Sequence, residues 1–356
     1  MKYYKFKIYG AGSIGAHFTN QLINYASKID IYDLDKTARK RFKNNIFKKR
    51  YKYWSNKINI LENDDTNEKY NLVIIGTPPN SHLTIAKKIL KSKHVPDFVH
   101  IEKPLSGYKT GIHQEFLELF KNKKTKFHCG YNHLFTKNTI DLISFVRKNI
   151  NELPINIDIN WNESWNGIMA AHPWLQSPSD TYLGNIKHGG GALFEHSHCL
   201  NFLVFLVNEL NLGKISTVFC KMQKKVNLYN CDLVTKLIIQ TNKEVLSTIS
   251  TDVISDPPEK NITIKFKNFL IKWFCNYSAD SDRLEIYKNG KKYKIKKYKK
   301  ERSDDFKNQT IYLIKSLKNI KHYEKKYINM AIETQYLLQK SVESNKLGKE
   351  IKVGSI

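Results

Sequence analysis

The sequence predicts an α/β protein in which a doubly wound parallel sheet is followed by an α+β part with an open, mostly antiparallel sheet. Short apolar strands alternate with helical segments up to about Gly130, and a glycine-rich turn joins the first strand to the first helix. After Tyr131, longer stretches with period-two alternation appear, a pattern typical of antiparallel strands. At 356 residues the chain is long enough for two domains, which we expect at residues 1–130 and 131–356.

The first domain is expected to alternate strand and helix, which places parallel strands side by side with helices between them. The expected strands are Lys5–Tyr9, Ile29–Tyr32, Asn71–Ile75, Phe98–Ile101 and Lys126–Cys129, and the expected helices are Ile14–Ala26, Ser81–Ser92 and Gly111–Lys121.

The second domain is expected to be built on longer strands, at Ile155–Trp161, Ile215–Lys221, Leu233–Gln240, Val245–Thr251, Ile262–Lys267 and Phe269–Phe274. Asn289-Gly290 predicts a hairpin that joins Leu284–Tyr287 to Lys292–Ile295. Helices are expected after the glycine triplet Gly189–Gly191, at Asp304–Lys318 with Ser303 as N-cap, and at Ile328–Ser344.

The formal net charge of +26 comes almost entirely from lysine, in a chain also rich in Asn, Ile and Tyr. This mixture is what an AT-rich genome encodes, and arginine, the residue that reads base edges, is scarce. We therefore expect no nucleic-acid partner. Attraction of an anionic substrate, such as a nucleotide sugar, is the more useful interpretation of the charge.

Membrane insertion and secretion are not expected. No run of about 20 apolar residues is present, and the N-terminus enters a strand pattern directly, without a signal peptide. The five cysteines (Cys129, Cys199, Cys220, Cys231 and Cys275) form no C-x-x-C pair, which favours reduced thiols in a cytoplasmic protein over disulfides or a metal site.

The turn Gly10-Ala11-Gly12-Ser13-Ile14-Gly15 has the glycine spacing of a dinucleotide-binding loop. Gly10 permits the tight turn, Gly12 lets the backbone approach a pyrophosphate, and Gly15 lets helix and strand pack closely. The N-terminus of the following helix supplies N–H groups for the phosphates.

Asp33 stands at the end of the second strand, where an acid would accept hydrogen bonds from the adenosine ribose. An acid at this position disfavours a 2′-phosphate, so NAD is predicted over NADP. Lys36 and Arg39 follow closely and would accommodate such a phosphate, which leaves NADP as the alternative.

Further motifs follow the glycine loop, namely Ile75-Gly76-Thr77-Pro78-Pro79-Asn80-Ser81-His82, Glu102-Lys103-Pro104, Gly130-Tyr131-Asn132 and the glycine triplet with Glu195 and His198. With these motifs the chain resembles, over nearly its whole length, the glucose-fructose oxidoreductase/inositol dehydrogenase/MocA (Gfo/Idh/MocA) family. The resemblance implies a Rossmann domain that binds NAD(P). It also implies an open-sheet domain that carries the substrate pocket and mediates oligomerisation.

The resemblance also implies roles for individual residues. Cofactor-binding residues would be Gly10, Gly12, Ser13, Ile14, Asp33, Thr77, Pro78, Asn80, His82, Glu102 and Lys103. Lining the nicotinamide half of the cleft would be Thr77, Pro78, Asn80 and His82, and Glu102 would lie near the nicotinamide ribose. Lys103 would be the active-site lysine, with a cis peptide before Pro104. Oxidation of a secondary alcohol needs a hydride acceptor and a base, and a lysine beside the nicotinamide could share the latter role.

His198 is predicted to be the general acid/base that works with Lys103. In much of the family the glycine triplet is followed by an Asp and, four residues later, a His. Here Glu195 replaces the acid, Cys199 stands where that His would be, and His198 comes one residue earlier. His196 is expected to face a different side of the helix. A hydrogen-bonded core histidine is the alternative for His198.

The substrate pocket is predicted in the loop-rich stretch between the first long strand and the glycine triplet. Tryptophans and polar residues interleave there, and they would offer stacking faces and hydrogen bonds to a sugar. The candidates are Trp165, His172 and Tyr182, with Glu195, His198 and Asn132, which follows the last strand of the first domain. The alternative is that the tryptophans fasten the loop or bury a dimer face.

Together these features predict an NAD-dependent oxidoreductase that acts on a secondary hydroxyl, or the matching ketone, of a sugar, a sugar derivative or a nucleotide sugar. The alternatives are a redox-neutral NAD-dependent glycosidase and a non-catalytic dinucleotide-binding regulator. We further expect a homodimer or homotetramer assembled through the C-terminal sheet, with no nucleic acid, membrane or metal involved.

Overall fold

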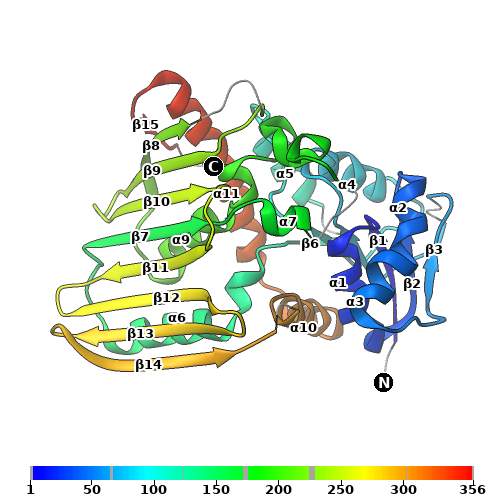
Figure 1. The fold of residues 1–356 in the computed structure, drawn as a ribbon, viewed down its shortest axis with the longest axis horizontal. Coiled ribbons are helices and arrows are strands. Elements are labelled where there is room, and N and C mark those ends of the chain that lie inside the picture. The colour runs from blue at the N-terminus through cyan, green and yellow to red at the C-terminus, as the bar shows by residue number, and fades with distance from the viewer. Residues whose placement is uncertain are drawn as a thin grey trace. The chain divides into compact units, whose positions relative to one another are not determined.

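The computed structural model describes residues 3–64, 67–122, 124–170, 175–223, 229–301 and 303–354. The chain forms two compact units (Figure 1). Unit 1 comprises Met1–Ser106, Gly111–Asn132 and Ser303–Ile332, and unit 2 comprises Gly107–Thr110, His133–Arg302 and Glu333–Ile356. The segment Ser303–Ile332, which the sequence interpretation gave to the second domain, thus belongs to unit 1.

Unit 1 contains a parallel sheet of six strands in the order β3-β2-β1-β4-β5-β6. The strands are β1 (Tyr4–Tyr9), β2 (Ala26–Tyr32), β3 (Ile58–Ile60), β4 (Leu72–Ile75), β5 (Phe98–Ile101) and β6 (Lys126–Cys129). The strand order reverses between β1 and β4, and ligands of such sheets bind beyond the carboxyl ends of the strands at this point. The predicted doubly wound parallel sheet is confirmed.

The helices of unit 1 are α1 (Ser13–Leu22), α2 (Lys36–Arg41), α3 (Lys49–Tyr51), α4 (His82–Leu90), α5 (Ile112–Phe120) and α10 (Asp304–Lys318), and a π-helix at Phe42–Lys48 joins α2 to α3. α1 ends earlier than predicted because Ala26 already begins β2. Strand residues such as Phe6, Ile8 and Ile74 are fully buried, which stabilises the unit by about 2 kcal/mol for each side chain. α10 packs on α1, with Phe306 stacked on His17 at 4.6 Å between ring centroids.

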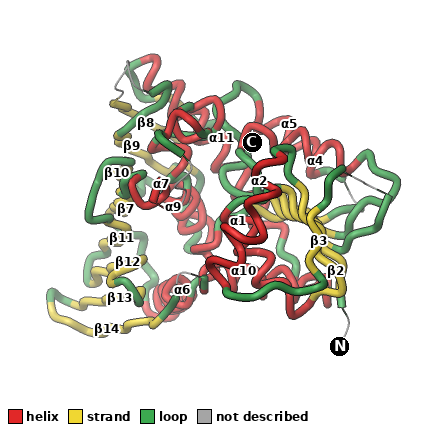
Figure 2. The backbone as a smooth tube through the Cα atoms, turned by 45° about the vertical axis from the view of Figure 1, so that its right-hand side comes forward, coloured by secondary structure: helices red, strands yellow, loops and turns green. Residues whose placement is uncertain are grey.

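Unit 2 contains a sheet of nine strands in the order β14-β13-β12-β11-β7-β10-β9-β8-β15, and all neighbours are antiparallel except β7 and β10. The strands are β7 (Asn156–Asn162), β8 (Ile215–Gln223), β9 (Val234–Thr241), β10 (Leu246–Asp252), β11 (Glu259–Lys265), β12 (Phe269–Ser278), β13 (Ser281–Lys288), β14 (Lys291–Lys299) and β15 (Ile351–Lys352). Figure 2 shows these strands as yellow segments of the tube. The predicted mostly antiparallel sheet is confirmed.

The hairpin predicted at Asn289-Gly290 joins β13 to β14, and both residues have positive φ, 51° and 75°, as its tight turn requires. The helices of unit 2 are α6 (Lys137–Asn149), α7 (Asn166–Ala170), α8 (Ala192–Glu195) and α9 (His198–Glu209), and α11 (Lys325–Leu347) crosses the division between the units. Across the described ranges of the chain, no helix has the length and apolar character needed to cross a membrane.

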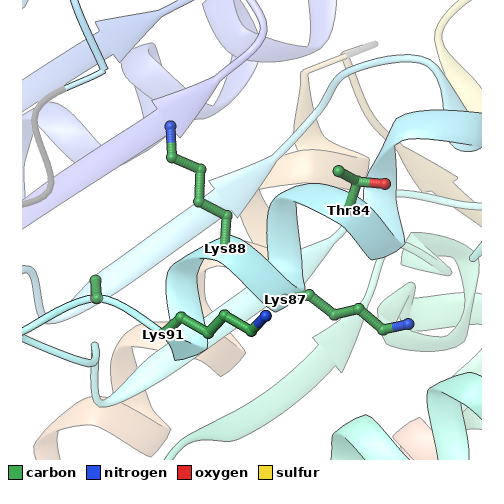
Figure 3. Close-up of a pocket in the computed structure, with 5 residues that line it drawn as sticks. Thr84, Lys87, Lys88 and Lys91 are labelled. Carbon is green, nitrogen blue, oxygen red and sulfur yellow. The ribbon is translucent and has the colours of Figure 1, made fainter.

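Part of the basic charge lies in two groups of lysines whose positions are explained by the protein itself and not by binding of a ligand. Charged edge strands resist pairing with other chains. The sheet-edge strand β14 carries six lysines, namely Lys291, Lys292, Lys294, Lys296, Lys297 and Lys299. Lysines of α4 line a surface hollow of about 470 Å³ (Figure 3). There Lys87 pairs with Glu115 at 2.7 Å, and Lys88 pairs with Asp64. Both cations are thus neutralised by the protein.

Candidate active site

The three glycines of the loop after β1 have different roles. Two of them are needed by the fold, and one leaves room for a ligand. Gly10 has φ +110°, and a Cβ there would lie 2.6 Å from the Gly76 carbonyl oxygen. A Cβ on Gly15 would lie 2.1 Å from the carbonyl oxygen of Gly10. A Cβ on Gly12 would meet nothing within 4 Å. The loop therefore offers open backbone at Gly12, where a dinucleotide pyrophosphate is expected.

Asp33 lies directly after β2 and joins that strand end to the glycine loop. Its Oδ2 accepts a hydrogen bond from the Ala11 N–H at 2.8 Å, and its Oδ1 accepts from the Asp35 N–H at 2.9 Å. Arg39 donates to the Asp33 carbonyl oxygen. Because each carboxylate oxygen has a further lone pair, Asp33 can accept hydrogen bonds from ribose hydroxyls and still hold the loop.

A cation lies at the N-terminus of α1 that the sequence interpretation missed. Arg50 of α3 donates from Nη1 to Ser13 Oγ at 2.9 Å, and the same atom lies 3.3 Å from Nε2 of His17. The Gly12 N-cap provides no side-chain cap, and the first turn of α1 contains no acid. The N-terminus of α1 is thus suited to binding an anion, because its backbone N–H groups can donate hydrogen bonds and the Arg50 guanidinium adds a positive charge. The only sequence signal was that Arg50 belongs to a basic, lysine-rich stretch.

The loop after β4 carries the predicted nicotinamide-side residues. Pro78 and Asn80 are exposed and Thr77 is half-buried. His82 is fully buried, with Nε2 2.8 Å from the Thr77 carbonyl oxygen and Nδ1 3.2 Å from that of Leu105. Burial lowers the pKa of its imidazole and so favours the neutral form. His82 thus holds this loop, and its place in the lining of the nicotinamide half of the cleft stays a prediction.

Glu102 and Lys103 follow the end of β5, one strand further from the switch point. Glu102 is 7% exposed, and its carboxyl group occupies the space that a Cβ on Gly130 would fill, at 2.6 Å. Lys103 is half-buried, and its peptide bond to Pro104 is cis, as the resemblance implied.

In unit 2, Gly190 and Gly191 of the glycine triplet are required by packing of the protein on itself. A Cβ on Gly190 would lie 2.1 Å from the Leu183 carbonyl oxygen, and one on Gly191, at φ +85°, would lie 2.3 Å from Asp232 Oδ1. The buried Asp232 also accepts a hydrogen bond from the Leu193 N–H at 2.8 Å and so holds the start of α8.

His198 is the first residue of α9 and lies among aromatic rings. Trp161 of β7 stacks on its imidazole, with centroids 5.6 Å apart and 22° between planes. His133 approaches edge-on at 4.7 Å. The sequence interpretation missed His133, although it directly follows Asn132. The helix expected after the triplet is interrupted at His196 and Ser197, so His198 begins a new one.

Cys199, which stands at the family's histidine position, is a poor proton carrier here. It is fully buried, its Sγ donates to the His196 carbonyl oxygen at 3.0 Å, and burial raises its pKa to about 12. Glu195 is 8% exposed and accepts a hydrogen bond from the Tyr182 hydroxyl at 3.0 Å. The structure thus brings two predicted substrate residues of unit 2 into direct contact.

The other substrate candidates differ in their surroundings. Trp165 is 5% exposed and packs edge-on against Tyr229 at 5.2 Å. Its predicted contact with a sugar and the alternative, that it fastens the loop, both stay predictions. Asn132 of unit 1 is 9% exposed, and among the described residues its Oδ1 has no hydrogen-bond partner. His172 lies outside the described residues. Across the described ranges, no three His, Cys, Asp or Glu side chains gather as a metal site.

Comparison with known proteins identifies the family. Residues 4–131 match the family model GFO_IDH_MocA, described as an oxidoreductase family with an NAD-binding Rossmann fold. This N-terminal region thus matches the Gfo/Idh/MocA family. The predicted resemblance is therefore confirmed, and the predicted cofactor agrees with a family that binds NAD. No curated protein matches the sequence closely enough to count as a relative.

Solved structures share the fold over the whole chain at low sequence identity. GenD2 from gentamicin A biosynthesis, in complex with NAD, has 12% identity and a TM-score of 0.77, covering 100% of this chain and 97% of its own. An inositol dehydrogenase homologue from Azotobacter vinelandii, complexed with NAD⁺, has 10% identity and a TM-score of 0.77, with coverages of 99% and 98%. The WlbA dehydrogenase from Bordetella pertussis, with NADH and UDP-GlcNAcA, has 12% identity and a TM-score of 0.73, with coverages of 100% and 99%.

Proposed function

We propose that this protein is an NAD-dependent oxidoreductase that transfers a hydride between nicotinamide and a secondary hydroxyl, or the matching ketone, of a sugar or nucleotide sugar. The observation that carries the proposal is the glycine loop of an NAD-binding family with Asp33 hydrogen-bonded beside it. Crystals of WlbA that contain UDP-GlcNAcA support a nucleotide sugar, and the net charge of +26 would favour such an anion.

The cofactor would be held along the carboxyl ends of the strands in unit 1. Gly12 and Ser13 would take the pyrophosphate at the start of α1, with Arg50 as an additional cation. Asp33 would bind the adenosine ribose, which favours NAD over NADP. Thr77, Pro78, Asn80 and Glu102 would contact the nicotinamide side. When bound, NAD supplies the hydride acceptor.

Lys103 and His198 would handle the proton of the substrate hydroxyl. Either nitrogen base can take this proton as the alcohol is oxidised and return it in the reverse direction. The stack on Trp161 holds the His198 imidazole in a fixed orientation, so little ordering is needed on substrate binding. Asn132, Tyr182 and Glu195 would bind the sugar hydroxyls.

We propose further that residues 1–130 bind the cofactor and that residues 131–356 bind the substrate and assemble a homodimer or homotetramer through the nine-stranded sheet. All five cysteines are buried and none forms a disulfide, which supports a reducing compartment such as the cytoplasm.

The test is NAD titration of the purified protein, followed by a screen of sugars and nucleotide sugars for NADH absorbance. We expect a substrate whose turnover falls at least 100-fold in Lys103→Ala, while Lys91→Ala, a change at an exposed lysine, leaves it unaltered. Turnover without a net absorbance change would favour the redox-neutral glycosidase. Absence of NAD binding would overturn the proposal.

A further inference from the structure

Two buried histidines lie behind Glu102, on the same face of the unit 1 sheet. β5 and β6 pair in parallel with His100 opposite His128, and these side chains are 0% and 1% exposed. Side chains two residues apart in a strand share a face, so His100 and Glu102 point the same way. Gly130 stands two residues after His128 and leaves the space that the Glu102 carboxyl group occupies.

Hydrogen bonds join the three side chains in a row. Nε2 of His100 lies 2.9 Å from Glu102 Oε1, and its Nδ1 lies 2.9 Å from Nδ1 of His128. An ionised carboxylate only accepts, so Nε2 of His100 donates to Glu102. A neutral His100 then has a bare Nδ1, which accepts the N–H of His128. The row therefore has one direction, from His128 through His100 to the carboxylate.

This arrangement admits at most one extra proton. If both histidines were charged, two N–H groups would face each other across 2.9 Å. Burial, together with the neighbouring His100, lowers the pKa of His128 well below its usual value, which keeps it neutral and able to donate. Glu102 also lies within electrostatic reach of His82 and Cys129.

Core packing does not account for these two polar rings. Phe18 lies 4.9 Å from His100, and Tyr312 lies 5.2 Å from His128, measured between ring centroids. In such aromatic surroundings a pair of apolar side chains would pack without the desolvation that two imidazoles incur. What apolar residues could not provide is a donor to Glu102.

We propose that His100 is a positioning residue for the cofactor site. With His128 behind it, His100 fixes the Glu102 carboxylate against Gly130 and thereby sets its orientation toward the nicotinamide ribose. This inference rests on the proposed function, because it takes Glu102 as a cofactor contact.

Two substitutions of His100 distinguish its role as hydrogen-bond donor to Glu102 from its role in packing. In His100→Gln, the longer amide can still donate to Glu102. In His100→Asn, the amide remains opposite His128 but is too short to reach the carboxylate. We expect His100→Asn to weaken NAD binding, measured by calorimetry, at least fivefold relative to His100→Gln. We also expect it to shift the pH profile of kcat, whereas His100→Gln stays within about twofold of the wild type.

If His100→Asn or His100→Gln does not fold, the double variant His100→Leu/His128→Leu takes its place. It replaces both histidines and so leaves no buried imidazole without its hydrogen-bond partner. We expect it to fold and to lose NAD affinity as His100→Asn does. Equal NAD affinity and an unchanged pH profile in the folded variants would mean that the histidines only pack, and would overturn the inference. A wild-type protein that does not bind NAD would instead overturn the proposed function itself.

Discussion

The candidate site residues of the two units are built in different ways. The cofactor half of unit 1 consists of backbone at strand ends, held by short local links such as the Asp33–Ala11 hydrogen bond. The half in unit 2 consists of side chains from distant segments, in which Trp161, His133 and His198 meet through the packing of the sheet and α9. Backbone sites leave motifs in a sequence, whereas sites assembled from packed side chains do not.

The largest effect that sharpens this comparison is expected at His198. His198→Gln should lower kcat at least 100-fold and leave NAD affinity within about twofold, because the imidazole handles a proton and does not hold the cofactor. His196→Gln is the matched control, since His196 Nε2 lies 3.2 Å from the Glu163 carbonyl oxygen and the amide can keep a bond there. Equal kcat values in the two variants would show that His198 is a core histidine and does not handle the proton.

Glycine-to-alanine substitutions compare the two halves directly. Gly12→Ala should change the free energy of unfolding little, because its φ of −104° suits alanine and the space is open, but should weaken NAD binding about tenfold. Gly190→Ala should destabilise the fold by about 1–3 kcal/mol, because its Cβ would overlap the Leu183 carbonyl oxygen. Urea unfolding and NAD titration of both variants check this. Loss of stability in Gly12→Ala with normal NAD binding would contradict it.

This contrast shows how much could be predicted from the sequence. β5 and β6 match their predicted bounds, and Gly10, Gly12 and Asp33 lie together as expected, because turn geometry and strand ends are local properties. The partners of His198 could not be predicted in this way. Trp161 meets it through the pairing of β7 with β10 and β11, and no local pattern encodes that pairing.

Residues that act through a neighbour were also missed. Arg50 belongs to a lysine-rich stretch that reads as solvated surface, and only the short α3 helix directs its guanidinium to Ser13. His100 lies inside an apolar strand, where a histidine is ordinary until the register places His128 opposite it. The cis peptide at Pro104 was expected only because of the family resemblance.

Arg50 tests whether the cofactor half depends on side chains as well as backbone. Arg50→Gln should weaken NAD binding about fivefold, because an exposed guanidinium beside the pyrophosphate contributes on the order of 1 kcal/mol. The loss should shrink with added salt, and adenosine binding should not change. Lys49→Gln, one residue earlier and also exposed, is the control. An equal loss in both variants would indicate only a general effect of charge.

The smallest effect concerns stability in mild acid. Burial lowers the pKa of His82 and His128 in the folded state, so the unfolded chain binds more protons below its own histidine pKa of about 6.5. Their contribution is therefore present above pH 6.5 and is lost as the pH falls, by about 0.4 kcal/mol per histidine between pH 6.5 and 6.0. His128→Gln should remove about half of this dependence in urea unfolding, whereas His322→Gln, at an exposed position, should leave it unchanged. An identical slope in all three proteins would mean that His128 does not resist protonation. The row behind Glu102 would then have no fixed direction.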